Sequence, residues 1–250
     1  MKEQIHTIPL TEAFTTEDEC PFCYLHRQIE HRAIRYFAGP SASYMEPDVR
    51  AITNRHGFCP DHMQKLYDYG NPLGNALMLQ TYYESVLRQL HTQLKNLQQP
   101  AKKGLLPRKK AVSTTPIWED IQQQVDDCAI CRRVEESMQR HYRVFFSLLK
   151  EAEFRQAVQG SKGFCMHHFA QLLQQAQDHL PGAYEAWFYD TVYALMAENL
   201  LRVKADLDHL ICKYDYRNAD LPWGNAKDAL QRAMQKMAGI YPADPPYQKE

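Results

Sequence analysis

A six-residue motif that occurs twice places the tightest constraint on how this chain can fold. Gly-Phe-Cys-x-x-His stands at residues 57–62 and returns at 163–168. Each copy follows a Cys-x-x-Cys pair, which lies at 20–23 in the first half and at 128–131 in the second. A single Cys-x-x-Cys could be a redox motif or a coincidence. Four pairs in matching order indicate instead a metal-binding framework that is present twice.

Three cysteines and one histidine in each half suit a tetrahedral zinc ion, which prefers four nitrogen and sulfur ligands. We therefore predict two zinc ions, one in each half, with an iron–sulfur cluster as the alternative. A redox pair of the thioredoxin type would need alternating strands and helices, which this sequence does not indicate. The predicted ligands are Cys20, Cys23, Cys59 and His62 in the first half, and Cys128, Cys131, Cys165 and His168 in the second.

Prolines beside two of these cysteines indicate how the ligands are held. Pro21 and Pro60 directly follow Cys20 and Cys59, and proline is favoured at the first position of a helix. We expect the two cysteines to cap helices, with the second ligand of each pair three residues later on the same side. The glycine before each Phe-Cys permits a tight turn. Four protein ligands leave no open coordination position, so we predict structural rather than catalytic ions.

Three other residues resemble ligands without fitting the pattern. His167 lies beside His168 and could replace it, but the match with His62 favours His168. We interpret His56 as a residue at the end of a helix and Cys212 as a small apolar residue that packs against its neighbours.

The remaining sequence pattern is helical, because apolar residues recur at helical spacing and alternating β-branched runs are missing. The series that follow the two Cys-x-x-Cys pairs are Leu25, Ile29, Ala33 and Phe37, and Val134, Met138, Tyr142, Phe145 and Leu149. A long helix beginning at Pro72 carries leucines at 73, 77, 87, 90, 94 and 97 as its apolar stripe, and a second long helix is expected to end near Lys213.

We predict an all-α protein made of two tandem, internally duplicated helical modules, each organised around a zinc site, with an additional C-terminal helix. The predicted divisions are a first module at 1–98, a basic proline-containing linker at 99–116, a second module at 117–213, a C-terminal turn and helix at 214–240, and a flexible tail at 241–250.

The C-terminal segment has no counterpart in the first half, and charged and aromatic residues are interleaved in it. Asn225 is expected to cap the helix that follows, with Asp228 near the positive helix end, and this structural interpretation accounts for most of the segment. The alternative is a surface for a ligand or partner, formed by Lys213, Asp215, Arg217, Trp223, Asn225 and Lys227.

Charge and hydropathy argue against two classes of partner. Lys and Arg total 29 against 30 Asp and Glu, so the net charge of −1 gives no general attraction to nucleic acid. The basic stretch at 99–116 is interpreted as a solvated tether. The first ten residues lack the apolar run of a secretory signal, and no stretch has the length and apolarity of a membrane span. We expect no membrane contact and a cytoplasmic location, where cysteines stay reduced.

The order of the motifs resembles a known bacterial family. Two Cys-x-x-Cys…Gly-Phe-Cys-x-x-His units, followed by Lys-Tyr-Asp-Tyr-Arg at 213–217 and Pro-Trp-Gly-Asn-Ala-Lys-Asp-Ala at 222–229, are similar to an uncharacterised family carried as a domain of unknown function. Its members are sometimes labelled automatically as substrate-binding proteins of ABC transporters, which does not suit a chain without a signal peptide or a lipoprotein cysteine. The resemblance implies the same eight candidate ligands over nearly the whole chain and implies no activity.

These observations favour a zinc-stabilised helical scaffold or adaptor that binds a protein partner. Its predicted metal sites are closed, and the sequence shows no recognisable nucleophile, phosphate loop or carboxylate pair. Enzymatic activity is left undecided, with a non-enzymatic role favoured. The alternative is an enzyme or small-molecule binder that uses the C-terminal cluster. Nucleic-acid binding and thiol redox or metal sensing are further alternatives.

Overall fold

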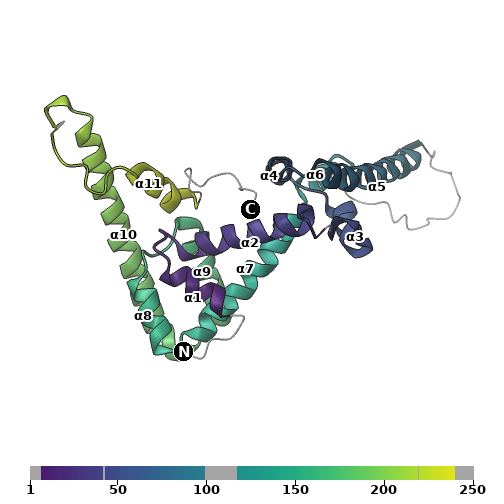
Figure 1. The fold of residues 1–250 in the computed structure, drawn as a ribbon. Coiled ribbons are helices and arrows are strands. Elements are labelled where there is room, and N and C mark those ends of the chain that lie inside the picture. Colours follow the sequence, from purple (N-terminus) through teal and green to yellow (C-terminus); the bar gives the residue numbers. More distant parts are fainter. Residues whose placement is uncertain (1–6, 42, 99–116, 219, 240–250) are drawn as a thin grey trace, which may run out of the picture. The chain divides into compact units, whose positions relative to one another are not determined.

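The computed structural model describes residues 7–41, 43–98, 117–218 and 220–239, and every regular element in these ranges is helical (Figure 1). The predicted all-α class is confirmed. The linker predicted at 99–116 and the tail predicted at 241–250 lie outside the described residues. None of the described helices combines the length and the apolarity that crossing a membrane requires.

The helices follow the same order in the two halves of the chain. Each half has a helix that starts after Cys-x-x-Cys, a short helix, a helix that starts after the cysteine of the hexapeptide, and a long helix. In the first half these are α2 (Pro21–Ala38), α3 (Pro47–His56), α4 (Pro60–Tyr69) and α5 (Pro72–Gln98). In the second they are α7 (Ala129–Leu148), α8 (Ala152–Gly160), α9 (Met166–His179) and α10 (Glu185–Lys213).

The other described elements precede or follow these helices. They are the helices α1 (Ile8–Thr15), α6 (Ile117–Asp126) and α11 (Ala229–Ala238), and the short 3-10 turns η1 (Ser43–Met45), η2 (Gly182–Tyr184) and η3 (Tyr216–Asn218).

Proline and asparagine set the helix starts as the sequence predicts. α2 begins at Pro21 and α4 at Pro60, where the fixed φ of proline suits the first helical position and its missing N–H costs no hydrogen bond. Asn71 caps α5, since its Oδ1 accepts a hydrogen bond from the backbone N of Gly74 at 2.9 Å. These local signals fix where α2, α4 and α5 begin.

Contacts divide the chain into two compact units that do not coincide with its two halves. The first unit holds the described residues within 1–29 and 136–245, and the second holds those within 30–135. The boundaries fall inside α2 and α7. The predicted modules at 1–98 and 117–213 describe a repeat in the sequence, and as structural modules they stay a prediction.

The first unit is built around a cluster of aromatic side chains. Phe22 of α2 stacks on Tyr142 of α7 with 4.7 Å between ring centroids, and Phe14 of α1 meets Phe154 of α8 edge to face at 5.3 Å. Edge-to-face and tilted contacts of this kind add to the free energy of burying the rings. In the same unit, α11 packs against both α9 and α10 (Figure 1).

The second unit has a smaller core. α3 packs against α5, and Phe37 at the end of α2 meets Phe58 edge to face at 5.7 Å.

All nine residues of the two apolar series predicted after the Cys-x-x-Cys pairs are buried. Three leucines of the α5 series lie outside the core, because Leu73, Leu87 and Leu94 are 67%, 63% and 54% exposed.

Candidate metal centres

The eight predicted ligands gather into two groups of four. The first set is Cys20, Cys23, Cys165 and His168, and the second set is Cys59, His62, Cys128 and Cys131; within each set the ligand atoms all lie within 4.8 Å of one another. The expectation that each half of the chain would hold its own four ligands is wrong. Each set joins the Cys-x-x-Cys pair of one half to the Cys-x-x-His pair of the other, and each lies within a single unit.

The same type of helix start builds all four pairs. A cysteine stands immediately before α2, α4, α7 and α9, and the second ligand follows three residues later in the first turn. The first set therefore joins the starts of α2 and α9, and the second joins the starts of α4 and α7. Backbone amides donate to the capping sulfur in three pairs, from Cys23 to Cys20 (3.4 Å), from Cys131 to Cys128 (3.5 Å) and from His168 to Cys165 (3.4 Å).

Glycines make the turns that bring the hexapeptide cysteines to these positions. Gly57 and Gly163 have φ angles of 59° and 74°, which residues with a side chain rarely adopt. A Cβ on Gly57 would lie 2.5 Å from the ring of Tyr82, so the turn also needs the space. The tight turn predicted before each Phe-Cys is confirmed.

In the first set, Nδ1 of His168 faces three sulfurs. It lies 3.5 Å from Sγ of Cys20, 3.3 Å from that of Cys23 and 3.2 Å from that of Cys165, and the Cys23 and Cys165 sulfurs are 3.6 Å apart. All four residues are buried, and the most exposed, His168, shows 4% of its surface.

The second set repeats this geometry around His62. Its Nδ1 lies 3.2 Å from Sγ of Cys59, 3.4 Å from that of Cys128 and 3.3 Å from that of Cys131, and the Cys59 and Cys131 sulfurs are 3.7 Å apart. Burial differs from the first set, because Cys131 is exposed and Cys59 is half-buried.

These separations fit one tetrahedral ion in the middle of each set. Bonds of about 2.0–2.3 Å to nitrogen and sulfur place the ligand atoms of a tetrahedron roughly 3.5–3.8 Å apart. The separations of 3.2 to 3.7 Å are close to that range. A disulfide would need a sulfur separation of about 2.05 Å, and all seven cysteines are free thiols. An iron–sulfur cluster inserts several atoms of its own between its ligands, so a single ion fits better.

The thiols of each set cannot all lose their protons without a cation between them. Hydrogen bonds from Cys20 and Cys23 lower the pKa of Cys165 to about 3, whereas the hydrogen bond to Cys165 and burial raise the pKa of Cys23. A hydrogen bond from Cys131 lowers the pKa of Cys128 to about 3, and the contact with Cys128 raises the pKa of Cys131. Thiols this close stabilise one thiolate and disfavour the next. A divalent ion removes that conflict and allows every ligand to lose its proton.

A carboxylate supports the histidine of the second set. Nε2 of His62 lies 3.0 Å from Oε1 of Glu30, and Nζ of Lys65 donates to the same oxygen at 2.8 Å. Burial would raise the pKa of Glu30, but the hydrogen bonds with His62 and Lys65 lower it to about 2. Burial would likewise lower the pKa of His62, but the bonds with Cys128 and Glu30 raise it to about 10. An ionised Glu30 keeps a proton on Nε2 and turns Nδ1 toward the sulfurs, where an ion would replace the second proton.

The C-terminal helix covers the first set. Gly239 directly follows the end of α11, and its carbonyl oxygen lies 3.3 Å from Sγ of Cys23. Gly239 has a φ of +76°, and a Cβ at this position would lie 3.3 Å from Sγ of Cys165. The end of the helix therefore lies so close to the Cys165 sulfur that a larger residue in place of Gly239 would displace it.

Side chains of α11 attach this cover to the segment before Cys20. Lys236 is 1% exposed, donates from Nζ to the carbonyl oxygen of Glu19 at 2.5 Å and pairs with its carboxylate at 3.2 Å. Gln235 donates to Oδ1 of Asp18 at 2.7 Å, and the same oxygen accepts a hydrogen bond from the backbone N of Cys20. Burial lowers the pKa of Lys236, and the neighbouring Glu19 carboxylate opposes that shift.

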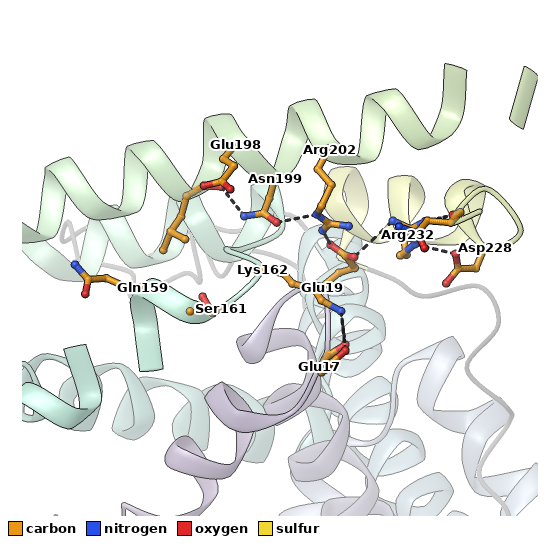
Figure 2. Close-up of a pocket in the computed structure, with 13 residues that line it drawn as sticks. Glu17, Glu19, Gln159, Ser161, Lys162, Glu198, Asn199, Arg202, Asp228 and Arg232 are labelled. Atoms are coloured by element: carbon orange, nitrogen blue, oxygen red, sulfur yellow. Dashed lines mark hydrogen bonds and ion pairs between the residues drawn. The ribbon is translucent and has the colours of Figure 1, made fainter. Parts of the chain in front are cut away.

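A polar cavity of about 540 Å³ adjoins this attachment (Figure 2). Glu19 is 4% exposed; its carboxylate pairs with Arg202 of α10 at 2.5 Å and lies 3.9 Å from Arg232 of α11. Arg232 also pairs with Asp206 at 2.8 Å and with Asp228 at 2.9 Å. The network joins α10 and α11 to the start of α2. Sequence reasoning missed it, although the acidic run 17–19 before the first ligand and the i, i+4 spacing of the two α11 cations were visible.

The C-terminal residues predicted as a ligand or partner surface do not gather around this cavity. Arg217 is exposed and pairs with Asp215 at 2.5 Å. Nζ of Lys213 lies 5.2 Å from the ring centroid of Trp223, and Lys227 is exposed. Of the six predicted residues, only Asn225 lines the cavity. Arg217, Trp223, Asn225 and Lys227 are exposed, and Lys213 and Asp215 are half-buried.

The expected cap at Asn225 is wrong. α11 begins at Ala229, and the cap position is Asp228, whose side chain makes no capping hydrogen bond. The carbonyl oxygen of Asn225 instead accepts a hydrogen bond from the guanidinium of Arg232, within the turns that precede the helix.

The three residues outside the ligand pattern stay outside both sets. His167 is exposed, and His168 takes the position facing the sulfurs. His56 ends α3, as predicted, and its Nδ1 lies 2.6 Å from Oδ2 of Asp127. Cys212 accepts a hydrogen bond from Asn218 at 3.0 Å.

Comparison with known proteins assigns a family without a function. The family described as "Family of unknown function (DUF6062)" matches residues 1–244. Searches among curated proteins and among solved structures find no match to the chain. Both ligand sets and the C-terminal cover lie inside the matched region.

Proposed function

We propose that this chain, which belongs to the DUF6062 family of unknown function, is a zinc-stabilised helical scaffold with two structural zinc ions. The observation that carries the proposal is the pair of closed ligand sets, each with three cysteine sulfurs and one histidine nitrogen around a common centre. Four protein ligands of this kind leave no position for a substrate or a reactive water, which is typical of structural rather than catalytic zinc.

Zinc is the ion that these ligands favour. Thiolate and imidazole are ligands of borderline-soft metals, whereas magnesium and calcium prefer oxygen. The oxygen ligands needed for a hard cation are not part of either set. A reducing compartment such as the cytoplasm would keep all six cysteines of the two sets able to bind an ion.

Each ion would act by fastening two helix starts that are distant in sequence. In the first unit it holds the start of α2 to that of α9, and in the second the start of α4 to that of α7. Metal binding at such a site contributes directly to the free energy of folding, because the unfolded chain has no preformed site.

Metal analysis of protein produced without added zinc tests the proposal. We expect two zinc ions per chain, loss of helical circular dichroism when a strong chelator removes them, and recovery when zinc returns. A Cys212→Ser variant, which changes a thiol outside both sets, should keep two ions. Protein that contains no bound metal but retains its full thermal stability would overturn the proposal.

An adaptor role would use the apolar surface of α5 and α6. These helices are joined by a hydrogen bond from Gln124 to Gln89 at 3.0 Å. Their exposed apolar side chains are Leu87 (63%), Leu94 (54%), Trp118 (67%), Ile121 (41%) and Val125 (51%). Leu87 and Leu94 lie seven residues apart on one face of α5, and an exposed apolar patch is typical of a protein-binding surface.

The adaptor role is tested separately from the metal. A variant with Leu87→Ser and Leu94→Ser should keep two zinc ions and its melting temperature, because both side chains are already exposed, but it should lose proteins that co-purify with the wild type. Equal recovery of the same proteins by both forms would remove this surface from the proposal.

A further inference from the structure

The two ligand sets differ most in how far solvent can reach their sulfurs. In the first set the contact between the sulfurs of Cys23 and Cys165, at 3.6 Å, is buried. In the second set the corresponding contact between Cys59 and Cys131, at 3.7 Å, is exposed. Both contacts join the Cys of a hexapeptide to the second Cys of a Cys-x-x-Cys pair. The sets are chemically alike, but only the second has an exposed cysteine, Cys131, beside a half-buried one, Cys59.

The difference has a structural cause in the C-terminal helix. Gly239 at the end of α11 lies against Cys23 and Cys165, and the carbonyl oxygen of Gly239 is 3.3 Å from the Cys23 sulfur. No described element of the second unit closes over Cys131 in this way, because its side chain remains exposed. The inner half of the second set, Cys128 with His62, is buried like the first set.

We propose that the second set is a reactive zinc–thiolate centre that small peroxides oxidise, forming a Cys59–Cys131 disulfide and releasing its zinc ion. The proposal rests on the structural zinc proposed above, and it adds a chemical reactivity that a purely structural site would lack. Reaction of a cysteine with an oxidant requires thiolate character and access, and a bound zinc ion provides the first while exposure provides the second.

The reaction balances with one peroxide for each disulfide. The Cys131 thiolate attacks one oxygen of hydrogen peroxide, the O–O bond breaks, and a sulfenic acid forms as hydroxide leaves. The Cys59 thiolate, 3.7 Å away, then attacks that sulfur, the S–S bond forms and a second hydroxide leaves. Two protons convert the hydroxides to water. The two cysteines lose two electrons and the peroxide gains them, while zinc loses two of its four ligands and dissociates.

The first set supplies an internal control in the same molecule. Its three cysteines have at most 2% of their surface exposed, so peroxide reaches them only when α11 detaches or the unit unfolds. We therefore expect oxidation to stop after one zinc ion has left. A protein with one ion and one disulfide would persist until a dithiol and zinc restore the starting state.

The experiment uses the full chain with both zinc ions bound. Metal content is measured first, then hydrogen peroxide is added while a chromophoric chelator reports released zinc, and the disulfide is mapped by mass spectrometry of non-reduced peptides. We expect one zinc ion released per chain and a Cys59–Cys131 link. Release of both ions together, a Cys128–Cys131 link, or first oxidation of Cys23 or Cys165 would overturn the proposal.

Two further measurements test the proposal without removing a zinc ligand, so neither depends on a variant that fails to fold. Brief alkylation of the wild-type protein should modify Cys131 at least roughly tenfold faster than any cysteine of the first set, because reactivity follows access of the thiolate. Cys212→Ser should leave the zinc release unchanged. Protein that holds no zinc before oxidant is added would contradict the proposed function, whereas two bound ions with equal alkylation of both sets would contradict the reactive centre alone.

Discussion

The two ligand sets have the same composition and the same helix starts, yet their surroundings make them different sites. The first is buried beneath α11, and the second has an exposed sulfur pair and a histidine supported by Glu30. The comparison teaches that the ligand motif determines which ion can bind, while the elements packed against it determine how firmly the ion is held and what else can reach it.

Removing a buried ligand should have the largest effect. Cys165→Ser should lower the free energy of unfolding by several kcal/mol, since binding free energy at a structural site is folding free energy. Cys131→Ser should cost less, because water can fill the position of an exposed ligand. Urea unfolding monitored by circular dichroism measures both, with zinc content as a parallel readout. An equal or larger loss of unfolding free energy in Cys131→Ser would contradict the proposed difference between the two sets.

Glu19→Gln tests the attachment of the cover. Lys236 would lose its buried counter-charge, and breaking a buried pair by removing one partner costs about 3–5 kcal/mol. Zinc of the first set should then leave faster in chelator, with the second set unchanged. Asp215→Asn, in an exposed ion pair, is the matched control and should not change the melting temperature. Equal acceleration at both sets would contradict this assignment of Glu19.

Glu30→Gln tests how the carboxylate beside His62 supports the second set. Loss of the carboxylate behind His62 should weaken zinc binding in the second set by roughly 10–100-fold, which is the usual effect of removing such a support. Competition with a chelator of known affinity measures the change. Glu84→Gln, an exposed carboxylate on α5, is the control. An unchanged affinity in Glu30→Gln would show that the carboxylate does not position the ligand.

Gly239→Ala should have the smallest effect, and it tests the cover most locally. An alanine at positive φ costs about 1 kcal/mol, and its Cβ would lie 3.3 Å from the Cys165 sulfur. Gly224→Ala is matched for positive φ but has no atom within 4 Å of the added Cβ. Only the first variant should speed alkylation of the first set, and equal rates in both would contradict contact between helix end and ligands.

Local features of the fold could be predicted because short-range signals determine them. Proline after cysteine gave the starts of α2 and α4, and the helical spacing of apolar residues gave the buried faces of α2 and α7. The glycine before each Phe-Cys gave the tight turns. The spacing of the Cys-x-x-Cys and Cys-x-x-His pairs identified all eight residues that gather into the two sets.

Long-range features could not be predicted in the same way. The spacing within Cys-x-x-Cys shows that two ligands share a helix start, but it does not show which distant pair completes the set. Charged residues are rarely buried, so the acidic run at 17–19 and the spacing of the α11 cations did not by themselves mark Glu19 and Lys236 as buried partners. The capping signal at Asn225 failed because turns continue up to Asp228 and α11 begins only at Ala229.

Zinc content of two double variants tests the central claim, that each ion joins a Cys-x-x-Cys pair from one half to a Cys-x-x-His pair from the other. Cys20→Ser with Cys165→Ser removes two ligands of one set, so native mass spectrometry should find one zinc ion per chain. Cys20→Ser with Cys59→Ser removes one ligand from each set, so both ions should be lost or loosely held. The reverse result, with one firmly bound ion in the second variant and none in the first, would contradict the account.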